Sequence, residues 1–93
     1  MPNTSIKKRH SETLEAAKES LFTDDVMLRD MSSATIAIDP KKIPQAKKMI
    51  REFQDRLCEF LEAGNNKSEV YEVSMQIFPR SQVNKEKVYE NFQ

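Results

Sequence analysis

The stretch between Pro44 and Gly64 constrains the fold of this chain more than any other part of the sequence. Its apolar residues recur at helical spacing over about five turns, which predicts one long amphipathic helix. Proline suits the first turn of a helix, and glycine commonly follows the last residue of one. We therefore expect a helix that begins at Pro44 and stops at Gly64-Asn65-Asn66. Its apolar stripe consists of Ala46, Ile50, Phe53, Leu57, Phe60 and Leu61.

A second helix is predicted near the N-terminus, from about Ile6 or Ser11 to Leu21. The residues that share its apolar face are spaced by three or four positions, as an amphipathic helix requires. Residues 1–5 read as a disordered leader, and Thr23-Asp24-Asp25 ends the helix or caps a short turn. The shared face consists of Ile6, His10, Leu14, Ala17 and Leu21.

Two further segments, residues 33–39 and 70–78, alternate between apolar and polar positions. A period of two is typical of half-buried β-strands, so we expect a strand in each segment. Pro79 would end the second strand. The residues on the apolar faces are Ala34, Ile36 and Ile38 in the first segment, and Tyr71, Val73, Met75 and Ile77 in the second.

The junction between the first strand and the long helix contains Asp39, Pro40 and Pro44. Asp39 suits a cap position, and Pro40 suits a first helical position, where no backbone donor is needed. A proline four residues further on would disrupt one continuous helix. We therefore expect a short turn at residues 40–43, followed by the long helix.

The order helix, strand, long helix, strand predicts an α+β fold over residues 6–80. The long helix would return the chain so that the strands run parallel in a right-handed βαβ unit, with both helices on one face of a small sheet. Two strands leave unpaired edges, so we expect a second copy, the tail or a neighbouring domain to complete the sheet. The tail, residues 81–93, reads as flexible or partly helical.

The balance between basic and acidic residues limits the classes of partner that this chain is expected to bind. Fifteen basic residues match fifteen acidic ones, whereas a stand-alone nucleic-acid binder usually carries a basic excess. The basic clusters at 7–9 and 41–48 are therefore interpreted as solvated faces. The sequence has no apolar run of about 18 residues and no signal-peptide pattern, and its single cysteine fits a reducing compartment. We expect a cytoplasmic protein that does not bind membranes.

The sequence offers no catalytic, metal-binding or cofactor-binding constellation. His10 is the only histidine, and it has no cysteine or histidine neighbour with which to form a zinc site. Cys58 lies near the C-terminal end of its predicted helix, where the helix dipole disfavours a thiolate. A single glycine excludes a Gly-rich phosphate loop. We therefore expect a protein that is not an enzyme and has no cofactor.

Five polar residues remain as candidate structural or ligand contacts: His10, Arg29, Asp30, Tyr71 and Gln76. The Arg29 guanidinium can bond backbone carbonyls or a carboxylate and so fix the connector before the first strand, or it can capture a ligand. His10 can be a histidine at the edge of the core or a ligand contact. A small-molecule effector would need a pocket lined by Tyr71 and Met75, with His10 or Arg29 as a polar group.

Several segments together resemble a module of a known bacterial family: His10 with Leu14 and Ala17, the run 29–38, Ile50-Arg51-Glu52-Phe53, and the run 70–79. The resemblance covers about residues 6–80. Its most specific parts are Arg29-Asp30 and Gln76-Ile77-Phe78-Pro79. In that family the module has no known function of its own and forms the C-terminal half of helix-turn-helix transcription regulators.

The resemblance implies a role in transcription regulation and supplies no catalytic residues. The N-terminal DNA-binding half of the family is absent from this sequence, so contact with nucleic acid would depend on that half. We expect a non-enzymatic regulatory module that acts by dimerisation or by binding a longer paralogue or another protein. The alternative is an effector-sensing domain.

Overall fold

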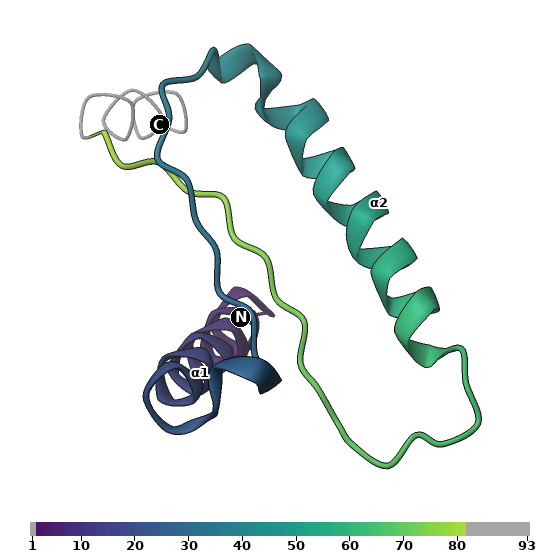
Figure 1. The fold of residues 1–93 in the computed structure, drawn as a ribbon. Coiled ribbons are helices and arrows are strands. Elements are labelled where there is room, and N and C mark those ends of the chain that lie inside the picture. Colours follow the sequence, from purple (N-terminus) through teal and green to yellow (C-terminus); the bar gives the residue numbers. More distant parts are fainter. Residues whose placement is uncertain (1, 82–93) are drawn as a thin grey trace. The chain divides into compact units, whose positions relative to one another are not determined.

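The computed structural model describes residues 2–81, which contain two long helices and two short 3₁₀ helices. The chain divides into two units, Met1–Ala37 and Ile38–Gln93. The first unit contains α1 (Pro2–Thr23) and η1 (Val26–Leu28), and the second contains η2 (Pro40–Lys42) and α2 (Ile43–Glu62) (Figure 1). Each unit is described in turn.

Helix α1 begins at Pro2, earlier than the predicted start at Ile6 or Ser11 and inside the stretch assigned to a leader. Proline is tolerated there because the first turn of a helix needs no backbone donor. The predicted stop is confirmed, since α1 ends at Thr23. At this end the Thr23 hydroxyl donates to the Glu19 carbonyl at 3.0 Å, and the Asp24 N–H donates to the Ser20 carbonyl at 3.0 Å.

The η1 turn follows α1 almost at once. Its Leu28 N–H donates to the carbonyl of Asp25 at 2.9 Å, which closes the turn. Arg29 then leaves in an extended conformation, with φ −134° and ψ 162°. The residues of η1 are exposed, so this turn projects apolar side chains to solvent.

The predicted junction of a turn and a long helix is confirmed in the second unit. Asp39 caps η2, because its carboxylate accepts the N–H of Lys41 at 3.0 Å and its carbonyl accepts the N–H of Lys42 at 3.0 Å. Pro40 begins η2, and Pro44 lies in the first turn of α2. The division into η2 and α2 places both prolines at positions where no backbone donor is required.

Helix α2 ends at Glu62, as the glycine signal predicts. The Ala63 N–H still donates to the Glu59 carbonyl at 3.1 Å, but Ala63 itself has left the helical conformation. Gly64 then adopts φ 153°, which residues with a side chain rarely take. Glycine at this position lets the chain turn away from the helix axis.

The prediction of an α+β fold is wrong. Residues 2–81 contain no β-strand, and residues 33–39 and 70–78 belong to no helix or strand (Figure 1). The right-handed βαβ unit, the placement of both helices on one sheet face and the sheet to be completed by a partner are all overturned with it. Alternation fixes which side chains share a face of an extended chain, but a strand exists only where a neighbouring backbone pairs with it. Residues 2–81 contain no such ladder.

The side chains described, those of residues 4–81, include none that is buried. On α1 and α2 the predicted apolar faces are at most half-buried, and large residues such as Leu14 (49% exposed) and Phe60 (76% exposed) face solvent. Ser81 belongs to no helix, and the rest of the predicted tail lies outside the described residues. The helices are therefore amphipathic as predicted, but no core covers their apolar sides in this part of the chain.

Candidate functional site

The end of α1 carries a cluster of polar contacts centred on Asp24. Its carboxylate accepts the Ser20 hydroxyl at 2.7 Å, and its carbonyl accepts Nε of Arg29 at 3.2 Å. Together with the backbone bond from Asp24 to Ser20, these contacts connect the last turn of α1 to the residue that follows η1. The sequence analysis missed the Ser20–Asp24 pair, although a hydroxyl four residues before a carboxylate at a helix end is a usable signal.

Arg29 is half-buried and contacts a backbone carbonyl, which is the kind of contact that a structural role for this guanidinium requires. The adjacent Asp30 is exposed. His10 is exposed on α1, whereas the sequence analysis considered a place at the edge of a core. The arrangement of Arg29 favours a role in holding the connector over a role in ligand capture.

The two candidates in the second unit lie in the segment after α2. Tyr71 is 63% exposed, and the Gln76 amide donates to the Ser74 hydroxyl at 3.1 Å. His10, Arg29 and Asp30 belong to the first unit. Three of the five candidates therefore lie in the first unit and two in the second.

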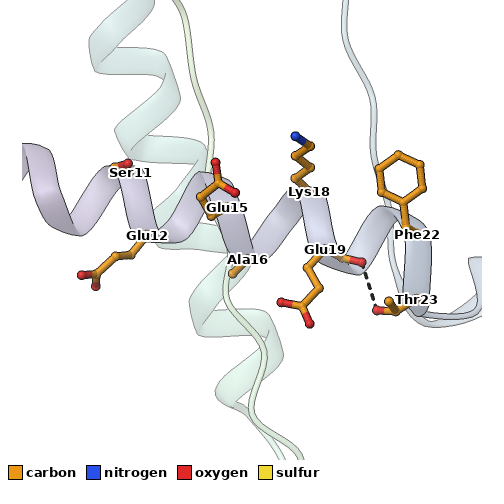
Figure 2. Close-up of a pocket in the computed structure, with 8 residues that line it drawn as sticks. All are labelled: Ser11, Glu12, Glu15, Ala16, Lys18, Glu19, Phe22 and Thr23. Atoms are coloured by element: carbon orange, nitrogen blue, oxygen red, sulfur yellow. Dashed lines mark hydrogen bonds between the residues drawn. The ribbon is translucent and has the colours of Figure 1, made fainter.

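A shallow hollow lies along α1 and is lined by residues of this helix alone (Figure 2). Glu12 and Glu19 extend from one side of the helix, and Glu15, Lys18 and Phe22 extend from the other (Figure 2). One helix provides only one wall, and ligand sites usually enclose most of the ligand surface. None of the five candidate residues lines this hollow. Its lining consists of Ser11, Glu12, Glu15, Ala16, Lys18, Glu19, Phe22 and Thr23.

Metal ligands do not cluster in the described part of the chain. Across residues 2–81, no group of three or more histidine, cysteine or acidic side chains is placed to hold an ion. Cys58 is a free, half-buried thiol on α2.

The most regular apolar surface is a stripe on α2, here called the α2 seam. Its residues are alternately three and four positions apart in the sequence, which is the pattern of helices that pack side by side. Ile43 extends the predicted stripe by a turn at its N-terminal end. Four of the six residues are half-buried, while Phe53 and Phe60 are 47% and 76% exposed. The α2 seam consists of Ile43, Ala46, Ile50, Phe53, Leu57 and Phe60.

A second group of apolar residues lies at the end of α1, on η1 and just after η1. Its members are all exposed, and Phe22 and Met27 are 77% and 84% exposed. Burying one large apolar side chain contributes about 1.5–3 kcal/mol, so both surfaces could stabilise an association substantially. This group consists of Leu21, Phe22, Val26, Met27, Leu28 and Met31.

The charges of α2 and of the turn before it are segregated along the helix. Residues 41–51 contain five basic side chains and no acidic one, which gives a net charge of +5. Residues 52–62 contain four acidic side chains and one basic one, which gives a net charge of −3. A helix dipole favours the opposite arrangement, with acidic residues at the N-terminus and basic residues at the C-terminus. An ion pair between Lys48 and Glu52, at 3.9 Å, lies on the exposed surface at the boundary.

The described part of the chain is thus helical, with apolar surfaces that are open to solvent, and none of its helices is long and apolar enough to cross a membrane. Residues 1–79 match the family described as "Domain of unknown function (DUF4423)", and the chain belongs to this family. The match includes Arg29-Asp30 and continues to Pro79. No curated protein and no solved structure matches the chain.

Proposed function

We propose that this chain is a non-enzymatic regulatory module of a bacterial transcription regulator, and that it acts through dimerisation or through binding of another protein. The observation that carries this proposal is the absence of any buried side chain within residues 4–81, combined with amphipathic helices. Amphipathic helices of this kind gain most of their stability by packing their apolar faces. A protein partner can provide that packing.

Two features of the sequence support the regulatory part of the proposal. Arg29-Asp30 and Gln76-Ile77-Phe78-Pro79 are the motifs on which the resemblance to transcription regulators rests, and both lie within the family match. The net charge of zero is unfavourable for DNA binding by this module alone, because phosphate neutralisation supplies most of that affinity. In this proposal a separate DNA-binding segment contacts the promoter, and the module works in the cytoplasm.

Sedimentation equilibrium of the whole chain over a range of micromolar concentrations tests the dimerising form of the proposal. We expect the average mass to rise above that of the monomer as the concentration increases. Phe60→Glu should lower this mass, because it places a charge on the α2 seam at a residue that is 76% exposed. Val70→Glu is the matched control, since Val70 is 99% exposed and lies outside the seam.

An average mass that stays at the monomer value at every concentration, together with cooperative unfolding, would argue against dimerisation. In that case, failure to bind a longer paralogue would contradict the proposal as a whole. Effector sensing has weaker support, because the hollow on α1 has a single wall and lacks the candidate residues. Thermal-shift measurements with metabolites would reveal an effector as a rise in the unfolding temperature.

A further inference from the structure

We draw no further inference here: the strongest candidate, the apolar stripe on α2 that forms the α2 seam, is an open helix face, and nothing in the structure of residues 2–81 shows what covers it.

Discussion

At the scale of single residues, the ends of the helices depend on a few polar groups and one glycine. The Asp39 carboxylate satisfies a backbone donor at the start of η2, and the Asp24 carboxylate and carbonyl hold the exit from α1. Gly64 provides the conformation by which the chain leaves α2. Because these contacts are local, each can be tested by a substitution that leaves the apolar faces intact.

Replacing Asp39 by alanine should loosen the turn before α2. The substitution removes the acceptor of the Lys41 N–H, and the loss of such a cap typically costs about 0.5–2 kcal/mol of helix stability. We expect faster amide hydrogen exchange at Lys41 and in the first turn of α2, measured by NMR. Asp30→Ala is the matched control, because Asp30 is exposed and outside the helices. Equal exchange in both variants would contradict the capping role.

Replacing Gly64 by alanine should destabilise the end of α2. An added Cβ would meet no atom within 4 Å, so the whole effect comes from the backbone conformation at φ 153°. Residues held in such a conformation cost about 1–3 kcal/mol. The thermal unfolding midpoint, followed by circular dichroism, should fall in Gly64→Ala and change little in Asn65→Ala. A higher midpoint in Gly64→Ala would show that another residue tolerates this position.

At the scale of elements, the sequence was sufficient to predict the helices. The periodic stripe between Pro44 and Gly64, and the Asp39-Pro40 junction, correspond to α2 and η2 almost residue by residue. These signals are local, because helix hydrogen bonds and caps join residues that are close in sequence. The start of α1 was missed because Pro2 lies before the first residue of the apolar stripe.

The predicted strands failed for the opposite reason. Residues 33–39 and 70–78 have the alternation of a strand, but a strand also needs a neighbouring backbone, which alternation does not specify. The candidate site was predicted less well than the helices. The hydrogen bond from Arg29 to the Asp24 carbonyl is a structural contact, which the sequence analysis named as one of two alternatives for Arg29. The contacts of Asp24 depend on the exact residue at which α1 ends.

The charges of α2 give a prediction about its helix content. Glu59→Lys combined with Glu62→Lys places cations near the C-terminal end of the helix, where each is favourable by about 0.3–1 kcal/mol. We therefore expect a higher helix content in dilute protein, which circular dichroism at low salt measures.

The control for this prediction carries the same change of charge on α1, as Glu12→Lys combined with Glu15→Lys. It should raise the helix content less, because Glu12 and Glu15 lie away from the C-terminal end of α1. An equal rise in both double variants would attribute the effect to net charge alone. A lower helix content in the α2 variant would contradict this account of the helix dipole.

At the scale of the whole molecule, the main question is what stabilises the two described helices. Most of the stability of a helix in a protein comes from packing its amphipathic face rather than from helix propensity. The surfaces on α2 and at the end of α1 are open to solvent, and no side chain among residues 4–81 is buried. The proposal that another protein supplies the packing therefore links the stability of the chain to its function.

The most direct test of this account is the thermal unfolding midpoint of the whole chain, measured by circular dichroism over a wide range of protein concentrations. If association supplies the packing, the midpoint must rise with concentration, because binding that is restricted to the folded state stabilises it by mass action. A cooperative transition whose midpoint is the same at every concentration would show that one copy folds by itself, and would contradict the account.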